Sequence, residues 1–385
     1  MDEEQLKYWI ALRAVEDVGA VGFKTLLAAF PSPREVFSAP AAMLQAVPGI
    51  GPKTAAHIRA FSDWKTAEQE IRRTAKLGAS IVTCADPGYP RNLLNIYDYP
   101  PFLYVRGSLV PDEITVALVG SRLASPYGRY VTENLSRELT LQGVTVVSGL
   151  ARGIDAAAHR GALAGKGRTI AVLGCGLDLI YPPENADLAE AVAAQGAIVT
   201  EFPLGTPPNP PNFPSRNRII SGISLGVVVV EAGEKSGSLI TARIAGEQGR
   251  SVFAVPGAID SAGSQGTHRL IKQGAKLVES VEDILEEILP QAGAIFHRDR
   301  FSDRPAAGGR PRDESNPPDP PAAGLSDREK RLLPLIPPDP VGIDQLIAAS
   351  SMTAQEVLNG LLVLELCGLV RQLPGKMFER KEPST

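Results

Sequence analysis

Between residues 114 and 288, short apolar runs alternate with segments of helical pattern, and this alternation constrains the fold most strongly. The runs lie at 114–120, 144–149, 168–174, 197–201, 226–232, 251–257 and 275–280. Helical segments lie between most of them, at 126–142, 153–165, 184–195, 215–223, 237–249 and 264–273. Strands that are apolar on both faces are typical of a parallel sheet covered by helices on both sides. The pattern therefore predicts a doubly wound α/β domain with a parallel sheet.

The regions on either side of this alternation have different compositions. Residues 1–75 are predicted to be all-helical, with an internal repeat at VGAVGFKTLL and VPGIGPKTAAHI. Residues 76–290 add a short strand, SIVT, and a Pro- and Tyr-rich segment before the α/β pattern. Residues 291–325 are rich in Pro, Gly and charge and are predicted to form a disordered linker. Residues 326–385 combine three helical patterns with two short strands around Pro374-Gly375, which predicts a winged-helix unit.

The 385 residues include 39 basic and 43 acidic residues, for a net charge of −4. This balance argues against a generally basic nucleic-acid binder but leaves room for a local basic patch. The three cysteines and four histidines have neither disulfide nor metal-ligand spacing, so no disulfide, metal or cofactor is expected. We expect a soluble, cytoplasmic protein, since no signal peptide or membrane-spanning run is apparent.

The carboxyl ends of the predicted strands carry Gly, hydroxyl and charged residues, as in GSR (120–122), SGLARGID (148–155), GCGLD (174–178) and KSGSLITA (235–242). Ligands bind at this edge of an open parallel sheet, where small residues and helix N-termini admit phosphate groups. Five basic residues from the same edge supply cationic partners: Arg122, Arg152, Arg216, Arg218 and Lys235. The sequence therefore predicts a site for an anionic ligand.

Known nucleotide and catalytic motifs do not fit this edge. GCGLDL lacks the third Gly of a dinucleotide fingerprint, and GIGPKT is not a P-loop, so both kinds of nucleotide are disfavoured. Candidate catalytic residues are Asp155, His159, Asp178, Glu201, Glu231 and His268. His159 either shares a helix face with Asp155 or packs beneath the loop. Glu231 is either a general base or an acceptor that orients the Lys235 loop, and no catalytic set stands out.

Phe213 follows the proline run PPNPPN and precedes SRNR. An aromatic ring beside two arginines suits stacking of a base with neutralisation of its phosphates. The alternative is a loop anchor that packs into the sheet.

In order, the motifs GSR, SGLARGID, GCGLD, YPPEN, FPSRNRIISG, KSGSLITA, VPG and GTHRLI resemble the DNA-processing protein A (DprA, or Smf) family over about residues 114–285. The resemblance implies an extended Rossmann-like sheet flanked by a helix-hairpin-helix or SAM-like domain and a winged-helix domain. It also implies a non-enzymatic protein that binds and protects single-stranded DNA without sequence preference during natural transformation. RecA recombinase, which the family recruits and loads, and a second copy of the chain, bound through the α/β domain, are the implied partners.

Carried onto this chain, the family's DNA site comprises Gly120, Ser121, Arg122, Gly149, Arg152, Phe213, Arg216, Arg218, Lys235, Ser236 and Gly237. The loop at 203–212 has no Lys or Arg, so cationic contacts from that side are missing.

The N-terminal repeat resembles helix-hairpin-helix motifs, and its second copy, Gly49–Lys53, fits better than its first, Gly19–Lys24. These turns either contact DNA or merely join the helices of an interaction domain.

An enzyme remains the alternative, because the layout is also similar to nucleotide-phosphate hydrolases of the lysine-decarboxylase-like group. Their Pro-Gly-Gly-x-Gly-Thr loop is replaced here by Glu231 and KSGSLITA, which favours binding over catalysis.

Overall fold

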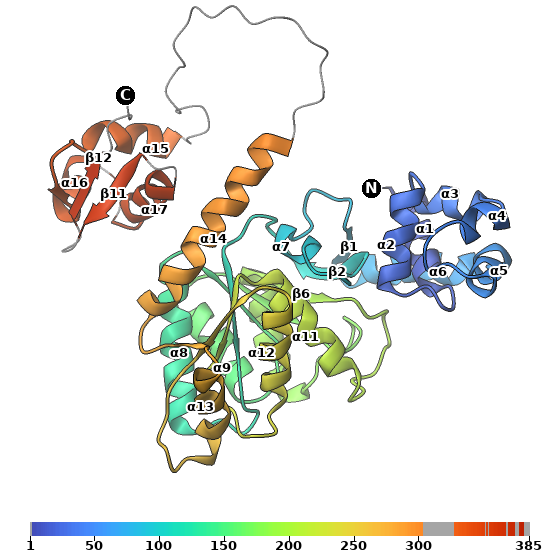
Figure 1. Ribbon diagram of the computed structural model, residues 1–385, viewed down its shortest axis with the longest axis horizontal. Coiled ribbons are helices and arrows are strands. Elements are labelled where there is room, and N and C mark those ends of the chain that lie inside the picture. The colour runs from blue at the N-terminus through green and yellow to red at the C-terminus, as the bar shows by residue number, and fades with distance from the viewer. Residues whose placement is uncertain are drawn as a thin grey trace, which may run out of the picture. The chain divides into compact units, whose positions relative to one another are not determined.

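The computed structural model describes residues 2–302, 327–350, 352, 354–366, 369–373 and 377–380 (Figure 1). The chain divides into two compact units, Met1–Leu285 and Glu286–Thr385. Helix α14 (Val281–Ser302) continues through the first part of the segment predicted as a linker. The rest of that segment, 303–325, and the turn at Pro374-Gly375 lie outside the described residues.

Within residues 2–302, one nine-stranded sheet forms the centre of the first unit, in the order β1-β2-β6-β5-β4-β3-β7-β8-β9. The strands are β1 (Ala79–Thr83), β2 (Phe102–Gly107), β3 (Thr115–Val119), β4 (Thr145–Ser148), β5 (Thr169–Val172), β6 (Ala197–Thr200), β7 (Gly226–Val229), β8 (Ser251–Ala254) and β9 (Lys276–Leu277). Strands β3 to β9 pair in parallel, which confirms the predicted doubly wound fold. Strands β1 and β2 extend one edge as an antiparallel pair, with β2 on β6.

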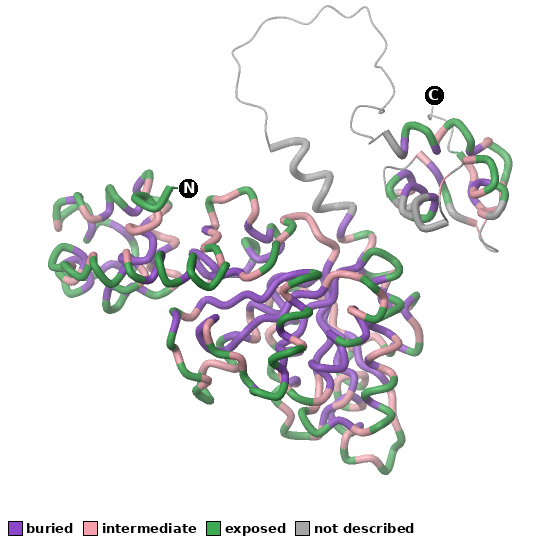
Figure 2. The backbone as a smooth tube through the Cα atoms, turned by 180° about the vertical axis from the view of Figure 1, so that it is seen from behind, coloured by how far each residue is buried: buried purple, intermediate pink, exposed green. Residues whose placement is uncertain are grey.

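Helices cover both faces of this sheet because successive strand residues point to opposite sides. On one face, α11 (Asn212–Ile223) packs against β3, β4 and β5, and α12 (Gly237–Glu247) packs against β7 and β8. On the other face, α10 (Ala186–Gln195) packs against Ala171 and Ile198. Helix α9 (Ile154–Ala164) contacts both α10 and α8 (Pro126–Leu141), and α13 (Gln265–Lys272) follows β8. Figure 2 shows the strands as the most continuously buried part of the chain.

The chain reverses direction across the sheet between β3 and β7. From β3 it runs outward through β4, β5 and β6, then returns by α11 to place β7 on the other side of β3. The loops that leave β3 and β7 therefore diverge and open a crevice beyond the carboxyl ends of these strands.

The first 76 residues form six helices in the described chain, as the sequence predicts: α1 (Glu3–Ala14), α2 (Ala20–Ala29), α3 (Pro33–Ser38), α4 (Ala41–Gln45), α5 (Pro52–Ala60) and α6 (Trp64–Lys76). The glycines of the repeat begin helices, since Gly19 caps α2 and Gly51 caps α5. The rings of Phe37, Phe61 and Trp64 contact one another inside this helical region in tilted and edge-to-face arrangements.

The second unit is the predicted winged-helix domain. Its described helices are α15 (Asp327–Leu332), α16 (Ile343–Ser350) and α17 (Ala354–Leu366), packed around Leu346, Val357 and Phe378. Its strands β10 (Val341–Gly342), β12 (Met377–Arg380) and β11 (Val370–Leu373) pair in that order, so a short strand that the sequence pattern did not reveal joins the expected two. No helix in the described parts of either unit has both the length and the apolar character needed to cross a bilayer.

Candidate functional site

A cavity of about 750 Å³ lies in the crevice between the loops that follow β3 and β7. Three further elements complete its wall: the loop after β4, the Pro-rich segment before α11, and the first turns of α11 and α12. Eight of the eleven predicted site residues line it: Gly120, Ser121, Arg122, Phe213, Arg216, Lys235, Ser236 and Gly237. The structure thus brings together eight residues that the sequence predicts from separate segments.

Phe213 stands in the first turn of α11 with its ring half-buried. One edge lies against the end of β5, where a side chain on Gly174 would come within 3.0 Å of the ring. The guanidinium carbon of Arg122 lies 5.0 Å from the ring centroid, and the Tyr181 ring lies 5.9 Å away. Phe213 therefore packs against the sheet, as the loop-anchor alternative expects, and also lines the cavity.

Arg216 forms the floor of the cavity rather than a free cationic contact. Its guanidinium is buried and donates to the backbone oxygens of Gly149, at 2.9 Å, and Val172. Gly149 must lack a side chain, because a Cβ there would lie 2.4 Å from the guanidinium. Burial lowers the pKa of Arg216 to about 10, so the group stays charged at neutral pH. Arg216 is therefore a buried, hydrogen-bonded part of the cavity floor.

Asp155 balances this buried charge from the start of α9. Its carboxylate accepts hydrogen bonds from the backbone N–H of Gly149 at 3.1 Å and of Ala151 at 3.4 Å. Burial raises its pKa, and Arg216 together with these N–H groups opposes that rise. The pair Asp155 and Arg216 thus ties the loop after β4 to α11.

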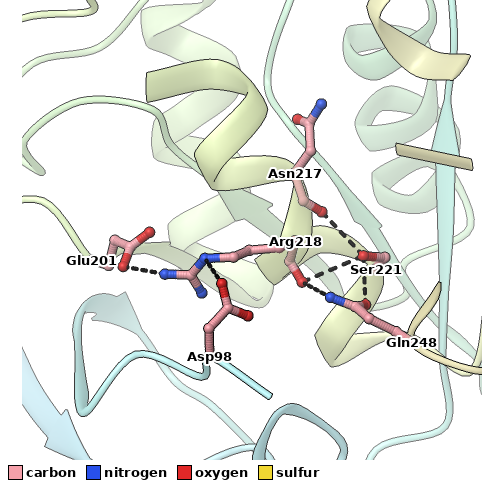
Figure 3. Close-up of polar contacts among 6 residues, drawn as sticks. All are labelled: Asp98, Glu201, Asn217, Arg218, Ser221 and Gln248. Atoms are coloured by element: carbon pink, nitrogen blue, oxygen red, sulfur yellow. Dashed lines mark hydrogen bonds and ion pairs between the residues drawn. The ribbon is translucent and has the colours of Figure 1, made fainter. Parts of the chain in front are cut away.

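Arg218, two residues further along α11, does not line the cavity. Its guanidinium lies between two carboxylates, 2.5 Å from Glu201 and 3.2 Å from Asp98 (Figure 3). Residues two apart on a helix differ by about 200° in direction, so Arg216 and Arg218 face opposite sides of α11. The expectation that both arginines serve one site is therefore not met by the side-chain positions.

Arg152 does not line the cavity either, and it forms an exposed ion pair with Glu184 that raises the pKa of the arginine. In contrast, Arg122 and Lys235 are exposed at the cavity mouth. Neither has an ion-pair partner within the described part of the chain. Two of the five predicted basic residues thus remain available to an anionic ligand, and a third lies beneath it.

The loop after β7 leads directly into α12, whose N-terminus opens on the cavity. Ser236 caps this helix by accepting from the N–H of Ser238 at 3.4 Å. A side chain on Gly237 would meet no atom within 4 Å, so the backbone here is accessible to a ligand. The helix N-terminus and its hydroxyl groups suit a phosphate.

The candidate catalytic residues are engaged in structural contacts. Glu231 accepts from both the N–H and the hydroxyl of Ser125 at 3.0 Å, so it holds the start of α8 and not the Lys235 loop. His159 is fully buried beneath the loop and contacts Thr169. Asp178 accepts from the N–H of Gly205 at 2.7 Å, and the imidazole of His268 lies against Gly257.

The N-terminal hairpins face each other through charged side chains. The Lys53 ammonium lies 3.0 Å from Asp17 and 3.9 Å from Glu16, and the hydrogen bond to Asp17 raises the pKa of Lys53. Ligand atoms of Glu16, Asp17 and His57 lie within 4.8 Å of one another, but Lys53 already supplies a positive charge to this exposed group. Lys53, the basic residue of the turn at 49–53, is thus paired with Asp17, which lies just before the turn at 19–24.

Sequence reasoning missed several other wall residues, among them Leu123, Tyr181, Pro208, Pro210 and Ile240. Tyr181 belongs to the YPPEN segment. An aromatic residue directly before two prolines was the sequence feature that could have marked it as a wall residue. Nothing local marks Leu123 or Ile240, since their contribution depends on how the β3 and β7 loops diverge.

The fold and the cavity define a class of protein: a doubly wound α/β domain with a cationic cavity at its switch point, joined to helical and winged-helix regions. Residues 80–289 match the family described as DNA recombination-mediator protein A, and residues 316–376 match the DprA winged helix domain. The chain belongs to this DprA/Smf family.

Relatives span most of the chain. It is 37% identical over 404 aligned residues to Protein Smf of Synechocystis, covering 99% of this chain and 100% of that protein. The solved DNA processing protein A of Streptococcus pneumoniae is similar with a TM-score of 0.63 and 34% identity, over 75% of this chain and 98% of the other. DNA processing protein A of Helicobacter pylori, whose structure gave insight into a single-stranded DNA binding mode, matches with a TM-score of 0.50 and 30% identity, over 55% and 96%.

Proposed function

We propose that this chain binds single-stranded DNA in the cavity at the carboxyl ends of β3 and β7, without reading the base sequence. The observation that carries the proposal is the Arg122 guanidinium 5.0 Å over the Phe213 ring, at a cavity whose exposed cations have no ion-pair partner in the described chain. Aromatic and guanidinium surfaces stack unpaired bases while cations neutralise phosphates. The single-stranded DNA binding mode of the Helicobacter pylori relative supports the same assignment.

The geometry favours a single strand over a duplex. The Phe213 ring is half-buried between Gly174 and Arg122, so only a base that has left its own stack can lie against it. The side-chain donors that line the cavity include the hydroxyls of Ser121 and Ser236 and the cations of Arg122 and Lys235. These groups match phosphate oxygens and do not select one base edge over another.

We propose that binding, and not catalysis, is the activity of this site. Asp155 and Arg216 neutralise each other beneath the cavity, while Glu231 is held by Ser125 and His159 by Thr169. A carboxylate or imidazole that is held by such hydrogen bonds is not positioned to accept a proton from a substrate as a general base. Release of free base from a nucleoside monophosphate, abolished by Glu231→Gln, would favour the hydrolase alternative.

We propose that the bound strand is protected and passed to a RecA recombinase during natural transformation. The family's description as a recombination mediator supports this role. A strand-exchange assay with RecA and DNA coated by a single-strand-binding protein tests it. The chain should shorten the lag before exchange, and an Arg122→Ala variant should not; equal lags would contradict the proposal.

We propose further that the chain forms a homodimer through the α/β domain. Strand β9 is an edge of the sheet, and its Leu277 side chain is exposed. A second cavity lies at this end of the sheet, next to β8. It is lined by residues of α12 and α13, including Leu239, Arg243 and Leu270. Exposed apolar residues on an unpaired strand edge favour association. Sedimentation of the full chain and of Leu277→Glu tests this proposal.

The binding proposal is tested by titrating labelled oligonucleotides of about 20 nucleotides, longer than one typical site, at two salt concentrations. We expect similar affinities for oligo-dT and mixed sequences, weaker binding of duplex, and a marked loss of affinity at the higher salt. Equal affinity for single strands and duplex would overturn the single-strand assignment.

A further inference from the structure

Next to the cavity, three large apolar side chains stand in solvent on the loop after β3 and the start of α8. Leu123 is 90% exposed, Tyr127 53% and Tyr130 68%. Leu123 also lines the cavity and directly follows Arg122, so this surface is continuous with the cavity mouth. Exposed apolar residues that adjoin one another mark an interaction surface more often than chance.

The two tyrosines lie three residues apart on α8 and therefore share one face of the helix. The Tyr127 hydroxyl donates to the backbone oxygen of Pro256 at 3.1 Å, which fixes one edge of its ring. Arg129 precedes Tyr130 and lies about 100° round the helix from it, on the neighbouring face. It is exposed and has no ion-pair partner in the part of the chain that the structure describes. The first acidic residue along α8 is Glu133, beyond Tyr130. The exposed first turns of α8 are thus aromatic and basic.

A cavity of about 750 Å³ has the size of a site for a compact ligand, so only a short stretch of a polymer fits inside it. The rest of a bound strand must continue over the adjoining surface. Aromatic rings with an unpaired arginine on the adjoining face of the helix fit bases and phosphates. A protein partner that covered both faces would have to bury the unpaired charge of Arg129.

We propose that single-stranded DNA leaving the cavity passes over Leu123 and the first turns of α8, with bases stacked on Tyr127 and Tyr130 and a phosphate bound by Arg129. This inference rests on the proposed function of the cavity and extends the binding site beyond it. The path ends near Glu133, where a carboxylate repels the backbone.

The test compares oligo-dT of about six and about 20 nucleotides, the shorter filling the cavity and the longer reaching α8. Tyr130→Ser should weaken binding of the longer strand roughly fivefold or more and leave the shorter one unchanged. Tyr130→Phe keeps the ring and should restore wild-type affinity. Arg129→Ala should lower the salt slope for the longer strand by about 0.7, while Arg137→Ala, exposed further along α8, should not.

Phe213→Ala is the internal reference, because it should weaken binding of both lengths. If Phe213→Ala changes neither length, the proposed function of the cavity fails. If Phe213→Ala weakens both but Tyr130→Ser weakens neither, or weakens both equally, the path over α8 is wrong and the cavity assignment stands. A Tyr130→Ser variant with wild-type DNA affinity but impaired self-association or recombinase binding would make this surface a protein interface and overturn the inference.

Discussion

The carboxylate of Glu70 on α6 accepts a hydrogen bond of 2.7 Å from the backbone N–H of Leu204, in the loop that leads to the Pro-rich wall of the cavity. Glu70 is buried. Next to it, Arg73 lies 3.4 Å from Asp178, which accepts from the N–H of Gly205 in the same loop at 2.7 Å. The helical region therefore holds one wall of the proposed DNA site.

We predict that Glu70→Ala weakens single-stranded DNA binding, although Glu70 lies outside the cavity. The variant leaves the Leu204 N–H buried without an acceptor, at a cost of about 1–3 kcal/mol, and frees the loop that carries Pro208 and Pro210. Oligonucleotide titration and thermal unfolding measure the two effects. The matched control is Glu68→Ala on the same helix, whose carboxylate pairs at the surface with Arg72, and it should bind normally. Equal behaviour of the two variants would contradict this coupling.

Replacement of Phe213 and Arg122 should reveal an energetic coupling between them. Phe213→Ala should cost about 1–3 kcal/mol of binding free energy for any sequence, through the lost base stack. Arg122→Ala should also lower the salt slope by about 0.7, the value for one phosphate on a single strand. Arg122→Lys should keep that slope but lose affinity, because an ammonium does not stack as a planar guanidinium does. A double-mutant cycle with additive effects would show that the 5.0 Å contact does not contribute to binding.

Arg218→Ala should affect folding and not DNA contact. The arginine is nearly buried between Glu201 and Asp98, and burial already raises the pKa of Glu201 against the opposing charge of Arg218 (Figure 3). Removing the arginine leaves the Glu201 carboxylate without its cation, so we expect a loss of about 3 kcal/mol in the free energy of unfolding. The salt slope of DNA binding by the folded variant should equal that of the wild type. Arg152→Ala, which breaks an exposed pair with Glu184, is the control and should leave stability nearly unchanged.

The sheet and its cavity were predictable because their signals are local. Each apolar run is followed by Gly, hydroxyl-bearing and charged residues, and these residues predict where β3, β4 and β7 end. Because parallel strands end at a common edge of the sheet, the residues that follow them lie close together. The antiparallel pairing of β2 with β6 was not predictable, because the residue pattern of a strand does not indicate which strand pairs with it.

The arginines mark the limit of local reasoning. A helix had been predicted across 215–223, and its geometry alone separates Arg216 from Arg218 by about 200°. Which of the two faces the cavity depends on Glu201 and Asp98, residues far away along the chain. The same holds for Arg152, whose direction is set by Glu184 on another loop.

Finally, His159 should make the free energy of unfolding depend on pH. Its Nδ1 lies 2.7 Å from the Thr169 hydroxyl, which itself donates to the backbone oxygen of Val146, so Nδ1 carries the proton and donates to Thr169. Burial, with the nearby charge of Arg216, lowers the pKa of His159 to about 3. The unfolded chain takes up a proton near pH 6.5 while the folded chain does not, so stability falls as the pH drops from about 6.5 toward 3, by up to about 1.4 kcal/mol per unit. Denaturant unfolding of the wild type and of His159→Gln across this range measures the difference between their free energies of unfolding. The buried carboxylates are present in both proteins, so their contribution to the pH dependence cancels in this difference. The gap between the two curves should narrow as the pH falls, and parallel curves would show that His159 is not held neutral in the fold.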